Sequence, residues 1–503
     1  MKKILIVSIL AIAMLFACVG CNFGVAPVNY SKGASPQPQS SATSDASSTS
    51  NPSATSTASS TVTPGPSSGT PSVTPSAQPT TPTWKTMDPT VYTPAFVLHD
   101  TSNAMDVQIN LQNGATSVNS IQLDSQTPNN WNFAYESGIL KVPQDFLAAK
   151  GTGKFTLRAN TNSGAVDCTL YVATKVITTC QEFQNIGTSN MPLTGTYVLG
   201  NDLDFSTFGN FNPIGNTGLV YGTKTGLDFT GIFCGAGHTI SNLTADADLM
   251  EDNDGTNPGG IHTEYNVDVG YTIPKLRSCF GIFMRNSGTI CDVCFKDCLV
   301  NNTVGTVMGM VAAVNEKKIE NVIVDGGSVI GGDIWLDFNC YVAGFAGMNG
   351  AGGSINNCIC ALDSIEGNGT HTLVRAFVGK TWGPITNCYA QEITSYTFFD
   401  IEMGTQYGEF IDHAGVYSSD PGDPNLTEKT GYGFTYLATD DRLQKADNLY
   451  GIVATASFTN SGIKTSAQLN AGTTADLYAN YSTDIWTISG TAMPQLNVLY
   501  TKA

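Results

Sequence analysis

Five short segments share one pattern and decide the fold: ISNL at 240–243, ICDV at 290–293, IENV at 319–322, INNC at 355–358 and ITNC at 385–388. Each begins with Ile, has Asn or Asp third and ends in an apolar residue or Cys. Their isoleucines lie 50, 29, 36 and 30 residues apart, so the first interval carries an insertion. Repeats of this length cannot bury an apolar face alone and must coil on one another. The pattern predicts a parallel β-solenoid.

The third position of the repeat predicts a column of polar side chains along the solenoid. In register, each would lie ~4.8 Å from the next and amides would hydrogen-bond from rung to rung. The column comprises Asn242, Asp292, Asn321, Asn357 and Asn387.

Cysteines occupy equivalent places in two adjacent repeats. Cys358 and Cys388 would be separated by a rung spacing compatible with a disulfide, and they could equally remain buried thiols. Cys291 and Cys294 have the spacing of a zinc motif. Residues three apart on a regular strand face opposite sides, however, and no second such pair accompanies them. Zinc binding by that pair is therefore not expected.

Residues between about Cys180 and Leu496 resemble the GLUG-motif surface proteins. The resemblance rests on the repeat, on Gly231-Ile232-Phe233 and Gly281-Ile282-Phe283 ahead of it, and on the entry segment 197–205. It implies a right-handed parallel β-helix over 180–503 with a C-terminal capping segment. Cys234 departs from the family, which usually has Asp there. The motif occurs on surface proteins of varied roles, so it implies little about function.

Residues 84–179 alternate apolar and polar side chains, as in Met105-Val107-Ile109-Leu111, with turn residues between the runs. Period two indicates half-buried strands, and several short strands predict an antiparallel sandwich. The segment resembles the X2-type immunoglobulin-like modules of bacterial extracellular proteins, notably at Asp106–Leu111 and Gly153–Leu157. The fold class expected for the whole chain is therefore all-β, an Ig-like sandwich followed by the β-helix.

The N-terminus has the features of an export signal. Two lysines precede an apolar run from Ile4 to Ala17, which is shorter than a membrane span. Leu15-Phe16-Ala17-Cys18 resembles a bacterial lipobox, with Cys21 as the competing acceptor. The resemblance implies a signal peptide at 1–17 and a lipidated Cys. Residues 18–83, rich in Ser, Thr and Pro, would form a disordered spacer. The expected location is the extracellular face of the cell membrane, held there by the lipid anchor.

Charge and composition exclude one class of partner. The chain has 23 Lys and Arg against 41 Asp and Glu, for a net charge of −18. Nucleic-acid binding is not expected, because a phosphate backbone requires a basic surface.

Paired carboxylates are the candidates for catalysis. Asp202/Asp204, Asp333/Asp337 and Asp400/Glu402 have suitable spacing, and β-solenoids include polysaccharide lyases and hydrolases. The first pair lies in the entry motif, where folding explains it, and the others carry no recognisable signature. We therefore assign no catalytic residue.

The insertion in the first interval contains candidate metal ligands. Asp252, Asn253 and Asp254 supply oxygen atoms beside a Gly turn, which suits calcium, although the spacing is not that of an EF-hand. A solvated acidic loop is the alternative.

These observations lead to a functional expectation with two alternatives. The expected function is a lipid-anchored surface protein that binds an extracellular glycan or protein, by adhesion and without covalent chemistry. The alternatives are a polysaccharide-active β-helix enzyme, either a lyase or a glycoside hydrolase, and a passive envelope scaffold.

Overall fold

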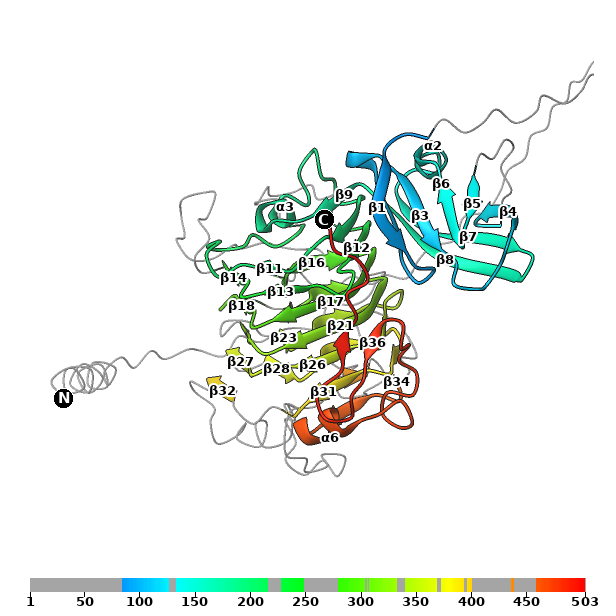
Figure 1. Cartoon of the computed structure of the whole chain (residues 1–503). Coiled ribbons are helices and arrows are strands. Elements are labelled where there is room, and N and C mark those ends of the chain that lie inside the picture. Colours follow the sequence, from blue (N-terminus) through cyan, green and yellow to red (C-terminus); the bar gives the residue numbers. More distant parts are fainter. Residues whose placement is uncertain are drawn as a thin grey trace, which may run out of the picture. The chain divides into compact units, whose positions relative to one another are not determined.

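The computed structural model describes residues 84–125, 133–215, 228–247, 279–303, 305, 307–332, 340–368, 372–392, 396–399, 436–437 and 458–502. The described chain is built mainly of short β-strands, most of them in parallel sheets, so the all-β class and the solenoid are observed (Figure 1). Within this part of the chain, no helix is both long enough and apolar enough to cross a membrane. The predicted signal peptide and spacer, with Cys18 and Cys21, lie outside the described residues.

The N-terminal module consists of two four-stranded sheets. Strand β1 pairs in parallel with β3, and β2 pairs in parallel with β8, whereas the remaining pairs are antiparallel. The sequence predicted a wholly antiparallel sandwich, but both sheets are mixed. One sheet has the order β1 (Met87–Tyr92), β3 (Asp106–Asn110), β6 (Ile139–Val142), β5 (Ala134–Glu136). The other has the order β2 (Val97–Asp100), β8 (Gly164–Ala173), β7 (Gly153–Thr161), β4 (Val118–Leu123). Two short helices, η1 (Thr101–Asn103) and α2 (Gln144–Ala148), connect strands.

Apolar side chains at alternate positions fill the space between these sheets. Val107, Ile109, Leu140, Leu157 and Leu170 are all buried, as the alternation predicts. Only Thr174 separates β8 from β9 (Lys175–Ile177), and β9 already pairs with the first solenoid strand, β10 (Thr196–Leu199).

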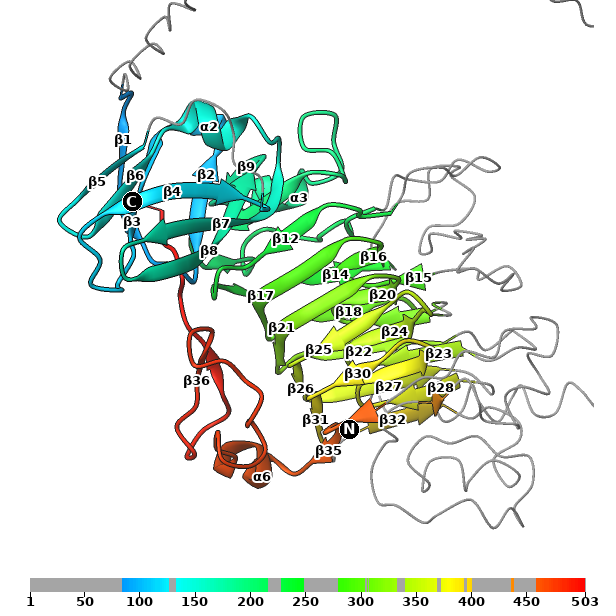
Figure 2. The ribbon, with the colours of Figure 1, turned by 90° about the vertical axis from the view of Figure 1, so that its right-hand side faces the viewer.

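The main sheet of the solenoid stacks one strand from each rung in parallel (Figure 2). The repeat isoleucines at 290, 319, 355 and 385 are direct register partners from rung to rung. The strands in this sheet are β9, β10, β12 (Ile232–Cys234), β17 (Thr289–Lys296), β21 (Lys318–Asp325), β25 (Ser354–Asn356), β30 (Ile385–Thr386) and β34 (Phe458–Thr459), joined by β11 (Leu203–Asp204), β13 (Thr239–Ser241), β26 (Ile359–Ala361), β31 (Tyr389–Gln391) and β35 (Gly462–Lys464).

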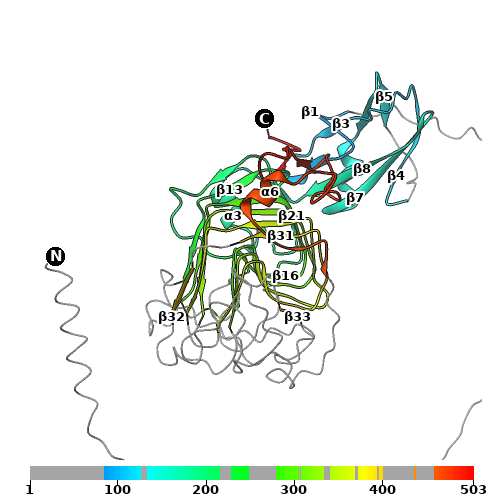
Figure 3. The same ribbon diagram turned by 90° about the horizontal axis from the view of Figure 1, so that it is seen from below.

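Three further parallel sheets complete the rungs, which overlay one another when seen from below (Figure 3). One contains β14 (Thr244–Asp246), β18 (Leu299–Asn301), β22 (Ser328–Gly331), β27 (Ser364–Asn368) and β32 (Tyr396–Phe399). A second contains β15 (Cys279–Phe280), β19 (Val307–Gly309), β23 (Cys340–Ala343) and β28 (Thr372–Arg375). The third contains β16 (Phe283–Asn286), β20 (Ala312–Asn315), β24 (Ala346–Asn349), β29 (Val378–Thr381) and β33 (Tyr436–Leu437).

Helix α3 (Cys180–Gln184) covers the entry to the stack. Its residue Phe183 is fully buried and packs against Phe211 and Phe233 with ring centroids 5.3 Å apart in both cases. The N-terminal end of the bore is thereby closed by apolar surface.

The C-terminal segment runs back along the rungs. Helix α6 (Ser466–Ala471) starts with a capping box formed by Thr465 and Gln468, and a hairpin of β36 (Trp486–Thr487) and β37 (Gln495–Leu496) follows. Near the end of the chain, Leu499 N donates to Ala236 O of the early rungs. We refer to residues 465–502 as the C-terminal strap.

Candidate functional site

The predicted polar column forms hydrogen bonds between successive rungs. Asn321 Nδ2 donates to Asp292 Oδ1 at 2.8 Å, Asn357 to Asn321 at 3.4 Å and Asn387 to Asn357 at 3.0 Å. All four residues have φ between 52° and 55°. Asn and Asp tolerate this left-handed conformation better than other non-glycine residues, which explains their place in the repeat.

Asn242 does not belong to this column, contrary to the sequence-based expectation. Strand β13 pairs with the second half of β17, so that Ile240 lies opposite Phe295 and not opposite Ile290. Asn242 Nδ2 donates instead to Asp204 Oδ1 of the preceding rung at 2.8 Å. The reason is that β17 is long enough to pair with both β12 and β13, and the repeat in the first rung matches its second half.

A second amide ladder lies inside the solenoid, and sequence analysis missed it. Asn286 Nδ2 donates to Asn315 Oδ1 at 2.8 Å, Asn315 to Asn349 at 2.8 Å, and Asn349 to Thr381 Oγ1 at 2.9 Å. All four side chains are fully buried. Asn286, Asn315 and Thr381 each stand four residues before a repeat Ile, which is the signal that would have revealed the ladder.

The predicted carboxylate pairs and the calcium loop are only partly within the described chain. Asp202 and Asp204 are described and have different structural partners: Asp202 Oδ1 accepts from Thr239 N, whereas Asp204 Oδ1 accepts from Ser206 N. Outside the described residues lie Asp252, Asn253, Asp254, Asp333, Asp337, Asp400 and Glu402.

The solenoid cysteines singled out from the sequence are free thiols, namely Cys291, Cys294, Cys358 and Cys388. Cys358 and Cys388 are buried in adjacent rungs without a disulfide between them. Cys291 and Cys294 belong to different apolar clusters, as expected from their spacing. The partner of Cys291 is instead Cys234, its direct register partner on β12.

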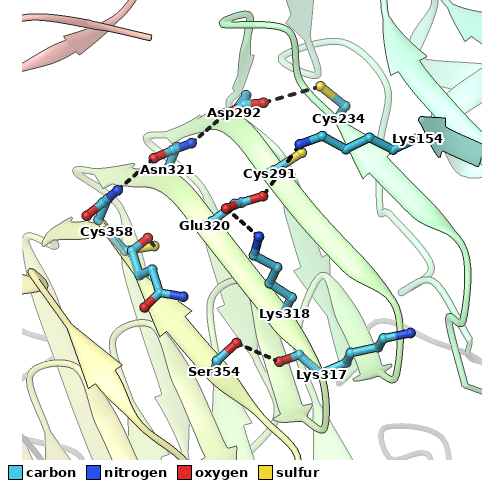
Figure 4. A network of polar contacts seen from close by, with 12 residues as sticks. Lys154, Cys234, Cys291, Asp292, Lys317, Lys318, Glu320, Asn321, Ser354 and Cys358 are labelled. Carbon is cyan, nitrogen blue, oxygen red and sulfur yellow. Dashed lines mark hydrogen bonds and ion pairs between the residues drawn. The ribbon is translucent and has the colours of Figure 1, made fainter. Parts of the chain in front are cut away.

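Cys234, Cys291 and Asp292 form the densest cluster of potential ligand atoms in the described chain. One ligand atom from each lies within 4.8 Å of the others, and Cys234 Sγ is 3.6 Å from Asp292 Oδ2. Both cysteines are fully buried and Asp292 is 5% exposed. We refer to these three residues as the thiol–carboxylate cluster (Figure 4).

Two side chains from the N-terminal module reach this cluster. The hydroxyl of Tyr171, on β8, lies 3.7 Å from Cys291 Sγ. Lys154, on β7, has its ammonium group 5.3 Å from the centroid of the Tyr171 ring and 3.8 Å from Glu320 Oε1. Glu320 also pairs with Lys318 at 2.7 Å. The cluster therefore lies where the module contacts the rungs, and residues from both surround it.

Burial dominates the electrostatics of the cluster. Burial raises the pKa of Asp292 above its usual value, against the opposing effects of Asn321 and Lys154. Contact with Cys234, together with burial, raises the pKa of the Cys291 thiol. Burial by itself would lower the pKa of Lys154, but the nearby Cys291, Glu320 and Asp292 outweigh it and raise that pKa. Lys154 is thus the cation that balances the acidic groups.

These groups form a small, buried polar cluster with one neighbouring ammonium group. Two sulfur atoms, a carboxylate and a phenol can hold a metal ion, and in the absence of one they form a polar network beside a cation. Sequence analysis noted Cys234 only as a departure from the GLUG pattern. The contribution of Lys154 and Tyr171 left no local sequence signal, since they lie more than 60 residues away in another module.

Comparison with known proteins yields little. No protein-family model matches the sequence, and no curated protein matches it. A search of solved structures found a protein described as "a putative immunoglobulin A1 protease from Bacteroides ovatus". The two chains are 15% identical with a TM-score of 0.34, over 64% of this chain and 92% of the other. The strand register of this chain, and not that likeness, defines its fold.

Proposed function

We propose that this chain is an exported, lipid-anchored surface protein that binds an extracellular glycan or protein without covalent chemistry. In this proposal Cys18 or Cys21 carries the lipid, an Ig-like module follows the spacer, and a right-handed GLUG-like β-helix presents the binding surface. The two-sheet module and the in-register rungs support the architecture. Anionic net charge supports a partner other than nucleic acid.

The observation that most favours binding over catalysis is that Asp202, Asp204 and Asp292 accept structural hydrogen bonds. Asp204 accepts from Asn242 and Ser206, and His238 Nδ1 lies 2.9 Å from Asp202 Oδ1. Asp292 accepts a hydrogen bond from Asn321 in the polar column. These groups hold turns and rungs together, whereas a hydrolase needs two carboxyl groups facing one substrate bond.

Cells that display the chain and otherwise identical cells that lack it would be labelled and applied to glycan and extracellular-matrix protein arrays. We expect only the cells that display the chain to be retained on one class of array spot. Adding the purified full chain should compete with these cells and reduce their retention. Equal retention of both cell types on every spot would refute the binding function. Release of reducing or unsaturated ends from a polysaccharide panel by the purified chain would refute it in favour of the enzyme.

The lipid anchor has its own test. Mass spectrometry of the membrane-extracted protein should find a lipid-modified N-terminal Cys, which moves or disappears in Cys18→Ser and Cys21→Ser variants. A soluble, unmodified mature chain would contradict the anchor while leaving the binding function open to the array experiment.

A further inference from the structure

The thiol–carboxylate cluster has no role in the proposed binding function. We propose that Cys234, Cys291 and Asp292 form a site for a thiophilic divalent cation of the zinc type, with the hydroxyl of Tyr171 facing the fourth position. The inference does not depend on the proposed function, because it concerns the junction between the module and the rungs and not a ligand-binding surface.

Distances within the cluster match the edges of a tetrahedral site. Bond lengths of ~2.3 Å for zinc–sulfur and ~2.0 Å for zinc–oxygen imply ligand separations of about 3.8 Å between sulfurs and about 3.5 Å between sulfur and oxygen. Cys234 Sγ lies 3.6 Å from Asp292 Oδ2, and Tyr171 Oη lies 3.7 Å from Cys291 Sγ. The remaining separations among the ligand atoms of Cys234, Cys291 and Asp292 are within 4.8 Å. Reaching the tetrahedral separations requires these three residues to contract by at most about 1.3 Å.

The backbone explains why these ligands meet. Cys234 and Cys291 face the same side because they are direct partners in a parallel pair of strands. Adjacent residues on a strand normally face opposite sides, but Asp292 has a φ of 55°, which interrupts the alternation after Cys291. The left-handed conformation that places Asp292 in the polar column therefore also brings its carboxylate to the two thiols.

Charge also favours a cation at this position. Two thiolates and one carboxylate around a divalent ion leave a net charge of −1, and the ammonium group of Lys154 balances it. Each bound ion displaces the two thiol protons, which pass to the solvent, so binding weakens as the pH falls.

The cation that flanks the cluster is partly open to solvent. The side chain of Lys154 is 38% exposed and that of its ion-pair partner Glu320 is 18% exposed.

A disulfide between the two cysteines is the competing arrangement, because the strand spacing of about 4.8 Å is also compatible with a disulfide. In this structure Cys234 and Cys291 are free thiols. The experiment below therefore includes the disulfide as an outcome that would overturn the proposal.

The test uses the full chain, reduced and stripped of metal with a chelator, and Co²⁺ as a spectroscopic probe. We expect one equivalent of Co²⁺ to bind with a thiolate-to-cobalt charge-transfer absorption, and Zn²⁺ to displace it. Cys234→Ala should lose this absorption and weaken binding by more than about 100-fold. Cys358→Ala is the control, because Cys358 also contacts a second buried thiol, Cys388 of the next rung, but has amides, Asn357 and Asn387, and no carboxylate in the adjoining position.

Asp292→Asn is a second variant, chosen because it should remove a ligand without impairing folding. The following rungs already have Asn at this position, so the variant keeps the hydrogen bonds of the polar column and loses only a charged ligand. We expect it to fold, as judged by far-UV circular dichroism, and to bind Co²⁺ at least about 10-fold more weakly. The proposal is overturned if the reduced wild-type chain binds no Co²⁺, if both variants bind like the wild type, or if the chain isolated without reductant contains a Cys234–Cys291 disulfide.

Discussion

The buried amide ladder offers a quantitative test of how the rungs are held together. Asn315 is completely buried, accepts a hydrogen bond from Asn286 and donates one to Asn349, both at 2.8 Å. Replacing it with Ala removes both of these bonds, together with a longer one from Asn315 Nδ2 to Ser354 O at 3.4 Å. Asn286 keeps its bond to Lys318 O at 3.1 Å, whereas the side-chain oxygen of Asn349 loses the donor from Asn315.

The expected cost follows from these contacts. Two neutral hydrogen bonds contribute about 1 kcal/mol each, and a buried oxygen without a donor costs about 1–3 kcal/mol more. Asn315→Ala should therefore lower the free energy of unfolding by about 3–5 kcal/mol. That is a large share of the stability of a typical domain, which is about 5–15 kcal/mol.

A double-mutant cycle separates the ladder from simple loss of packing. Asn349→Ala on its own should cost about 2–3 kcal/mol, but in the Asn315→Ala background no orphaned oxygen remains. We expect the two single costs to exceed the cost of the double variant by at least about 2 kcal/mol. Denaturant unfolding is followed by tryptophan fluorescence, since Trp382 N donates to Asn349 O and reports on this rung.

The reference variant for this cycle is Asn357→Gly in the outer column. Asn357 donates to Asn321 at 3.4 Å and accepts from Asn387 at 3.0 Å, its side chain is only partly buried, and Gly suits the φ of 52° at this position. We expect a cost of about 1–2 kcal/mol, because water can replace the lost partners at a partly exposed site. Costs in the Asn315–Asn349 cycle that add within about 0.5 kcal/mol would refute a cooperative ladder.

Three further predictions concern close packing, the C-terminal strap and pH. Gly231→Ala should prevent stable folding, because the added β-carbon would lie 1.9 Å from Gly195 O; a circular dichroism spectrum and melting curve like those of the wild type would contradict this. Tyr481→Phe removes only the hydrogen bond from the strap to Asn387 O at 2.8 Å, so it should cost about 1 kcal/mol in denaturant unfolding and increase hydrogen exchange in the strap; unchanged exchange would show that this bond does not hold the strap. Asp292→Asn should alter the pH dependence of metal-free stability. The raised pKa of this carboxyl means that its stabilising contribution is present below the unfolded pKa and is lost as the pH rises through the folded pKa. The stability of the variant relative to the wild type should therefore increase as the pH rises above about 4, the unfolded pKa of an Asp, and a difference that stays constant with pH would refute the assignment.

The repeat predicted much of the solenoid because its residues serve purposes that are local. An Ile facing inward at each rung buries an apolar side chain, and Asn two residues later tolerates a left-handed turn while donating and accepting hydrogen bonds. These requirements recur wherever the rung recurs, so Asp292, Asn321 and Asn357 could be aligned without a structure. Alternation in residues 84–179 likewise predicted strands with buried Val107 and Ile109.

The sequence did not predict the strand register of the first rung. Two strands, β12 and β13, share the single partner β17, and both have an apolar residue at the position that pairs with an apolar residue. Spacing cannot distinguish these choices when an insertion precedes the next repeat. Asn242 was therefore assigned to the wrong column.

By itself, the sequence determined that short strands repeat with an Ile and a left-handed Asn or Asp, because side-chain burial and backbone preference act within each repeat. Only the tertiary structure decided which half of β17 faces each earlier strand, and that Lys154 and Tyr171 meet Cys234, Cys291 and Asp292. The physical reason is that an assembly of groups from separate modules depends on how their surfaces pack, and no residue in either module encodes that contact alone.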